Sequence, residues 1–199
     1  AIRMPTPPQM HNEGNYIISL GNFCRWLGQQ AEALGVEIYP GFAVTDVIFD
    51  PDGEVEGVIT GDMGVARDGS HKDNYTPGIA LRGKYTFFAE GARGSLSKML
   101  IGKLGLDAES GPQKFGIGLK ELWEVPAEKH RPGLVQHTMG WPLDDKTGGG
   151  SFLYHFGERL VSVGFVVHLD YDNPYINPFK EFQRAKTHPS IRAHLEGGK

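Results

Sequence analysis

The sequence contains a single cysteine, Cys24, among 199 residues. One thiol cannot form a disulfide within the chain, and it cannot supply the several thiolates that hold an iron–sulfur cluster. Scarce cysteine is typical of a protein from a reducing compartment. Cys24 lies in "NFCRWLGQQAEALG", a segment with helical apolar spacing. We therefore expect a thiol packed in the core rather than a nucleophile.

Long apolar runs and a surplus of positive charge are also missing. No apolar segment approaches the roughly 20 residues that cross a bilayer, and the chain shows no signal-peptide pattern. The net charge is -4 at pH 7, with no basic stripe of the kind that neutralises phosphates, so no nucleic-acid partner is expected. The hydrophobic content of 39% and charged content of 22% are typical of a globular protein that buries a core.

Several catalytic motifs do not occur in the sequence. Neither the GxGxxG of a nucleotide-binding domain nor the GxSxG of a nucleophile elbow is present. The eight histidines are scattered without metal-binding spacing, so no metal site is expected. His137 and His155 lie on neighbouring predicted strands and could face each other or a ligand, although most such histidines are simply packed. The adjacent Asp144 and Asp145 follow a proline and are expected in a turn rather than as paired catalytic carboxylates.

The first half of the chain mixes helix and strand signals. Apolar residues recur at helical spacing from Tyr16 to Leu34. A polar loop or short hairpin, a strand ending in "TFFAEG" with an apolar pattern typical of burial on both faces, and a short helix from about Ser95 are predicted further along. Three extended segments lie between the helix that starts near Tyr16 and the polar loop, and the last two are joined by a "DPDG" turn. They are Val36–Tyr39, Ala43–Phe49 and Val55–Thr60.

The second half, beyond Gly111, is rich in strand signals. A helix is predicted to begin near Asn177 and Pro178 and to close the chain. Before it, short connections predict four successive, mostly antiparallel strands in "KFGIGLKELWEV", "GLVQHTMGW", "GSFLYHF" and "LVSVGFVVHLDY". The composition therefore predicts an α/β half followed by a sheet-dominated half, a mixed α+β and α/β architecture.

One candidate site lies in "TFFAEGARGS", where a predicted strand ends at Glu90 and Gly91. Backbone N–H groups left bare at the carboxyl end of a sheet are where α/β folds bind nucleotide phosphates. An ordinary strand-to-helix turn explains these residues equally well.

A second candidate site lies in "KTGGGSFLYHF". Glycine beside a strand costs backbone entropy and adds no packing, so three in a row require an explanation. Either the chain turns there with positive φ, or a flat ligand lies against exposed backbone. The turn accounts for Thr147 and Gly148 better than for Gly149 and Gly150, where the strand already begins.

Six stretches, in order and in register from Asn12 onward, resemble the electron transfer flavoprotein-ubiquinone oxidoreductase family. They are "GNYIISLGNFCRWLGQQAEALGVEIYPGFA", "FFAEGARGSLSKML", "FGIGLKELWEV", "GWPLDDKTGGGSFLYHF", "GFVVHLDYDNPYINPFKEFQR" and "HPSIRAHLEGGK". The resemblance implies an oxidoreductase, an electron-transferring-flavoprotein dehydrogenase, that passes electrons from reduced electron transfer flavoprotein through FAD and one [4Fe-4S] cluster to ubiquinone. It also implies a peripheral, monotopic place on the mitochondrial inner membrane (matrix face) or the bacterial inner membrane (cytoplasmic face).

The resemblance further implies a two-domain FAD-dependent oxidoreductase fold. Residues 1–15 would be the end of a membrane-contacting segment, residues 16–110 the middle part of the FAD-binding domain, and residues 111–199 a mainly antiparallel quinone-binding domain. The family's opening GxGxxG and its cluster cysteines have no counterpart here. We therefore expect an internal part of a longer protein that is not active alone.

Site residues follow by the same resemblance. The backbone of Gly149 and Gly150 would meet a quinone carbonyl oxygen, and Glu90, Gly91 and Val44 would lie near FAD. The alternatives are a related FAD-dependent reductase or hydroxylase acting on an isoprenoid or aromatic substrate, or a non-catalytic binding module.

Overall fold

The structure, a computed structural model, describes residues 2–199, which form two compact units. The larger unit combines the residues up to Ala31 with Gln113–Lys199, and the smaller unit is Glu32–Pro112. No helix among the described residues has the length and apolar character needed to cross a membrane.

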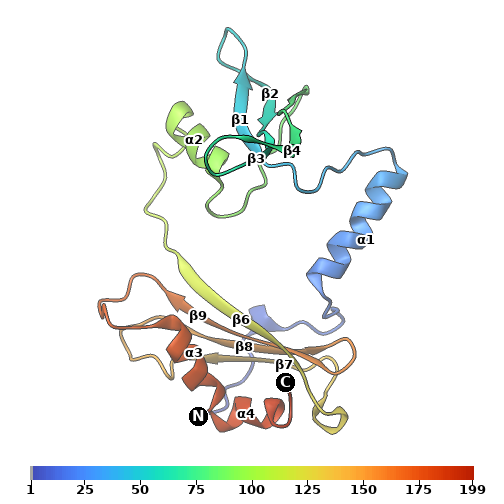
Figure 1. Cartoon of the computed structure of the whole chain (residues 1–199). Helices are drawn as coiled ribbons and strands as arrows, with labels where there is room; N and C mark the ends of the chain where they lie inside the picture. Colours follow the sequence, from blue (N-terminus) through green and yellow to red (C-terminus); the bar gives the residue numbers. More distant parts are fainter. Residues whose placement is uncertain (1) are drawn as a thin grey trace. The chain divides into compact units, whose positions relative to one another are not determined.

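The larger unit is built on a four-stranded sheet with the strand order β6-β9-β8-β7 (Figure 1). Every neighbouring pair is antiparallel, so the prediction of four antiparallel strands is confirmed. β8 and β9 are the inner strands, and β6 and β7 form the edges. The strands are β6 (Gly116–Glu124), β7 (Val135–Met139), β8 (Gly149–Phe156) and β9 (Leu160–His168).

Two helices, α3 (Pro178–Lys186) and α4 (Pro189–Leu195), cover one face of this sheet (Figure 1). Side chains alternate between the faces of a strand, so every second residue points toward these helices. The core between the two layers contains Leu153, Val161, Val163, Phe165, Val167, Phe182, Ile191 and Leu195. We call this side of the sheet the covered face and the other side the open face.

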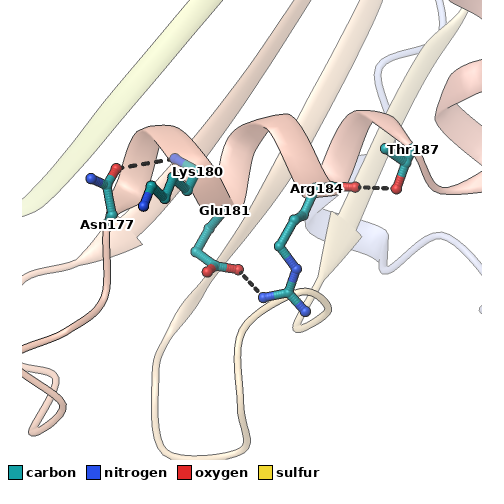
Figure 2. A network of polar contacts seen from close by, with 5 residues as sticks. All are labelled: Asn177, Lys180, Glu181, Arg184 and Thr187. Atoms are coloured by element: carbon teal, nitrogen blue, oxygen red, sulfur yellow. Dashed lines mark hydrogen bonds and ion pairs between the residues drawn. The ribbon is translucent and has the colours of Figure 1, made fainter.

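The start of α3 is fixed by Asn177, whose side-chain oxygen accepts a hydrogen bond from the Lys180 backbone N–H at 3.1 Å (Figure 2). An ion pair between Glu181 and Arg184 at 2.6 Å links adjacent turns. At the other end, the Thr187 hydroxyl donates to the Arg184 carbonyl at 2.7 Å. The sequence predicted the start of this helix correctly. It did not predict α4 as a separate helix, which has only 7 residues.

We expect Asn177→Ala to lower the free energy of unfolding by about 1 kcal/mol, because the N–H of Lys180 loses its acceptor. Urea unfolding followed by circular dichroism measures the change. Asn177→Asp keeps a capping oxygen and serves as the control. Equal stability of the alanine variant and the parent chain would contradict this role for the cap.

The smaller unit contains a three-stranded sheet with the order β1-β2-β5 and a separate β3–β4 hairpin. The predicted "DPDG" hairpin between the first two strands is confirmed by their antiparallel pairing. Helix α2 (Ser95–Leu104) packs on β1, and Val47, Leu96 and Leu100 form a small core there. The strands are β1 (Val44–Phe49), β2 (Val55–Thr60), β3 (Met63–Val65), β4 (His71–Thr76) and β5 (Ala80–Arg82).

One predicted strand does not form, and another is shorter than predicted. The segment Val36–Tyr39 has no strand structure, and the strand predicted to end in "TFFAEG" forms only as β5 and ends at Arg82, leaving the Phe87 side chain 89% exposed. A strand needs a neighbour for its backbone hydrogen bonds, and neither Val36–Tyr39 nor "TFFAEG" pairs with one among residues 2–199. An apolar pattern specifies a strand only where such a partner exists.

The helix predicted from the amphipathic pattern is present as α1 (Leu20–Ala33), but it buries none of its residues. The expectation of a packed Cys24 is therefore wrong, since the thiol is exposed. The apolar stripe of α1 stays largely in solvent, as the 53% exposure of Trp26 illustrates. Two short 3-10 helices, η1 (Pro8–Met10) and η2 (Ala127–Lys129), complete the fold.

Candidate functional site

The three glycines occupy a turn and the start of an inner strand. The turn begins at Asp144, whose carboxylate accepts a hydrogen bond from the Lys146 backbone N–H at 3.2 Å. A hydrogen bond from the Thr147 side chain is the main cause of the lowered pKa of Asp144. The prediction of a turn at Asp144 is confirmed, and Gly148 ends this connection one residue before β8.

Gly149 and Gly150 lie where the inner strands approach closely. Gly149 has a φ of +153°, and a Cβ atom there would lie 2.6 Å from the Leu143 side chain and would also clash with the Val166 carbonyl. A Cβ atom at Gly150 would overlap the Thr138 carbonyl oxygen and lie 3.1 Å from the Met139 Cα. Close packing in the sheet therefore requires glycine at both positions, an explanation that the sequence alone did not provide.

The strand register separates the two glycines. Gly149 shares the covered face with Ser151 and Leu153, whereas Gly150 belongs to the open face. On that face Gly150 pairs with Val166 of β9, which in turn pairs with Gly118 of β6.

Two residues further along β9 from Val166, a second pair of open-face residues lies closer to the end of the sheet. There Gly116 of β6 pairs with His168 of β9, and the His168 N–H donates to the Gly148 carbonyl at 2.9 Å. Glycines of β6 and of the start of β8 thus flank Val166 of the intervening strand β9. We call this region the glycine patch; it comprises Gly116, Gly118, Gly148 and Gly150.

An aromatic row continues the open face along the sheet. The Phe152 ring lies over Gly164, where an added Cβ would come within 2.9 Å of the ring atom Cε2. Phe152 stacks on Tyr154 with ring centroids 5.1 Å apart, and His137 meets Tyr154 edge-on at 5.8 Å. Bare backbone beside stacked rings forms a flat surface suited to a planar, largely apolar ligand.

His155 lies on the opposite face from His137, so these two histidines do not face each other. The His155 side chain is fully buried. Its Nδ1 accepts a hydrogen bond from the Arg131 backbone N–H at 3.1 Å, and its Nε2 lies 3.2 Å from the His194 Nδ1. Burial, and next the positive charge of neighbouring groups, lower the pKa of His155 to about 4. The ring is therefore a neutral part of the core under ordinary conditions.

The residues expected near FAD lie in the smaller unit. The Glu90 carboxylate accepts hydrogen bonds from the Ser97 hydroxyl and the Ser97 N–H, both at 2.7 Å, and these bonds lower the pKa of Glu90. Glu90 therefore holds the start of α2, where negative charge is favoured. Gly91 has a φ of +79° with nothing within 4 Å of an added Cβ, and Val44 lies on an edge strand at 38% exposure. Gly91 and Val44 are therefore accessible at the surface of the smaller unit.

An iron–sulfur cluster does not fit this chain. A [4Fe-4S] cluster takes four thiolates, and Cys24 is the single cysteine. Among residues 2–199, no group of three or more His, Cys, Asp or Glu side chains is arranged to hold a metal ion.

Sequence reasoning singled out Gly149 and Gly150 but not Gly116 and Gly118, which the sheet places on the same face as Gly150. The alternating glycines of "FGIGL" were a usable signal, because a period of two places both on one face of a strand. Their meeting with the other glycines depends on the order β6-β9-β8, which the sequence does not specify.

Comparisons with known proteins identify close relatives. The profile of a family described as "ETF-QO, ubiquinone-binding" matches residues 115–199. The chain is 59% identical over 194 residues to an electron transfer flavoprotein-ubiquinone oxidoreductase of Pseudomonas aeruginosa, covering 97% of this chain and 35% of that protein. It is 56% identical to the mitochondrial protein of that name from Dictyostelium discoideum, covering 100% of this chain and 33% of the relative. It is 55% identical to the mitochondrial protein of that name from Bos taurus, covering 99% of this chain and 33% of the relative.

The chain thus spans about a third of the length of the curated relatives that it matches. Among solved structures, a triple mutant of the flavin-dependent brominase Bmp2 matches with a TM-score of 0.57 and 18% identity, covering 89% of this chain and 41% of that one. At this identity the match reports a shared fold, that of a flavin-dependent enzyme.

Proposed function

We propose that the chain forms the ubiquinone-binding part of an oxidoreductase of the electron transfer flavoprotein-ubiquinone oxidoreductase family. The quinone ring lies on the open face at the start of β8, and a backbone N–H of Gly149 or Gly150 donates to one carbonyl oxygen. A hydrogen bond aimed at that oxygen stabilises the negative charge that develops during reduction.

The glycine patch is the observation that carries this proposal. Gly116 and Gly118 are exposed, Gly148 is exposed, and Gly150 is half-buried beside them. The side chains that border these glycines are those of Val166 and His168, and a planar ring would lie against them and against the Gly150 backbone. The neighbouring Phe152 and Tyr154 rings extend the same flat, apolar surface.

The smaller unit would contribute to an FAD site. Gly91 and Val44 would contact the nucleotide through the backbone, while Glu90 keeps the loop before α2 in place. Bound FAD would supply two-electron redox chemistry. A [4Fe-4S] cluster would require cysteines beyond Cys24, the single cysteine of this chain.

The proposed electron donor is reduced electron transfer flavoprotein, and the proposed place is the surface of a mitochondrial or bacterial membrane. The named mitochondrial relatives support this location. The segment ending near residue 15 would contact the membrane through exposed apolar side chains such as Ile2 and Met4, which are 88% and 76% exposed. The domain functions assigned to residues 1–15, 16–110 and 111–199 are part of the same proposal.

Nuclear magnetic resonance on chain labelled with 15N-glycine tests the quinone site. We expect titration with ubiquinone carrying one isoprene unit to shift the amide signals of Gly149 and Gly150, since a bound carbonyl changes the environment of those N–H groups. Gly102, on α2 in the smaller unit, is the internal control. An isoprenoid alcohol without the quinone ring is the ligand control.

The outcomes separate the candidate functions. Shifts at Gly149 and Gly150 with the quinone alone support the proposal. Equal shifts with the ringless alcohol would favour an isoprenoid-binding relative. No shift at either glycine at saturating quinone would reject the proposed site.

A further inference from the structure

We propose that His168 is the second polar contact of the quinone ring and the source of one proton for its reduction. This inference rests on the proposed quinone site, and it assigns a polar side chain to a site whose other polar contact comes from the backbone.

The position of His168 in the register carries the argument. Its ring lies over the Gly148 backbone, where an added Cβ would come 2.5 Å from the imidazole Nδ1. On the other side, an added Cβ at Gly116 would lie 3.7 Å from the imidazole Cδ2. The imidazole therefore occupies the space that two glycines leave open, at one edge of the glycine patch.

The spacing along the strand suits a quinone. Gly148 and Gly150 are two residues apart on the open face, a distance of about 7 Å along β8. This is of the same order as the separation of the two opposite carbonyl oxygens of a quinone ring. A ring held at one end by the backbone near Gly150 thus brings its other oxygen toward His168.

The surroundings of His168 suit proton transfer. The side chain is exposed, so it exchanges protons with water. Two charged groups lie beside it in the described chain: Asp170 and Lys114, which pair with each other at 3.3 Å. Lys114 and, to a smaller extent, His168 lower the pKa of Asp170. A histidine can carry and release a proton within the physiological pH range.

Both protons needed for reduction of the quinone have a source. Reduction of a quinone to a quinol takes up two electrons, supplied by a reduced flavin, and two protons. The His168 imidazolium breaks one N–H bond as the carbonyl oxygen forms an O–H bond, and the neutral ring regains its proton from solvent. The second oxygen takes its proton from water.

The experiment that tests this inference measures quinone binding rather than catalytic turnover. In chain labelled with both 15N-glycine and 15N-histidine, we expect the one-isoprene ubiquinone to shift the imidazole signals of His168 together with the Gly149 and Gly150 amides. The affinity should rise by about fivefold as the pH falls from about 8 to about 5, because the imidazolium donates a stronger hydrogen bond than the neutral ring. His168→Gln keeps a neutral donor and should bind with an affinity that does not vary over this range. His71→Gln, which changes an exposed histidine of the smaller unit, should retain the pH dependence.

The possible results distinguish the His168 contact from the quinone site itself. Shifts at Gly149 and Gly150 without a response of His168, or a His168→Gln variant with unchanged pH dependence, would overturn the inference and leave the proposed quinone site intact. Absence of the glycine shifts would reject the proposed site and this inference with it. Shifts at all three residues, with the pH dependence lost only in His168→Gln, would establish the contact.

Discussion

Gly150→Ala is expected to lower the free energy of unfolding of the larger unit by about 3 kcal/mol and to abolish quinone binding. The added methyl group would overlap the Thr138 carbonyl oxygen, which belongs to the backbone of β7 and cannot rotate away. The strands β7 and β8 would have to separate at the end of the sheet where the ring is proposed to lie. Urea unfolding at neutral pH measures the loss of stability, and the glycine amide titration measures the loss of binding.

Gly148→Ala is the matched control for this substitution. It adds the same methyl group two residues earlier, but there the methyl group meets only the exposed imidazole of His168, which can turn aside. We expect a stability change below about 1 kcal/mol. Equal destabilisation by the two alanines would show that close approach of the β7 backbone is not the reason for glycine at position 150.

The parts of the fold that the sequence predicted correctly depend on local signals. The "DPDG" turn, the strand alternation beyond Gly111 and the Asn177–Pro178 helix start each involve residues close together in the chain. The failures at "TFFAEG" and Val36–Tyr39 concern segments whose stability depends on a distant partner strand. The expectation of a buried Cys24 was wrong for the same reason, because no residue of α1 is buried against the rest of the described chain.

Prediction of the candidate site from the sequence was limited in the same way. Glycine composition drew attention to Gly149 and Gly150, but register alone shows that they belong to opposite faces. The glycine patch brings together residues of β6 and β8, which are distant in the sequence and lie on either side of β9 in the sheet. Sequence pattern can locate the members of such a site, whereas the arrangement of the strands assembles them.

The larger unit is expected to lose about 2–3 kcal/mol of stability as the pH falls from about 6.5 to about 4, through the titration of His155. The pKa of the buried ring is lowered from 6.5 to about 4, so over this range the unfolded chain binds a proton that the folded chain does not. Stability is therefore fully present above the unfolded pKa and is lost as the pH falls toward the folded pKa. Burial also lowers the pKa of His194, which adds an effect of the same sign.

Urea unfolding at a series of pH values, compared between the parent chain and His155→Gln, isolates this contribution. The variant replaces the titrating ring with a neutral side chain that can still pair with the Arg131 N–H, so its stability should fall less steeply between about pH 6.5 and pH 4 even if it is lower throughout. Carboxylates that titrate in the lower part of this range act on both proteins and cancel in the difference. Identical slopes would mean that the imidazole is protonated in the folded chain as readily as in the unfolded one, and that the Arg131–His155–His194 contacts do not depend on a neutral ring.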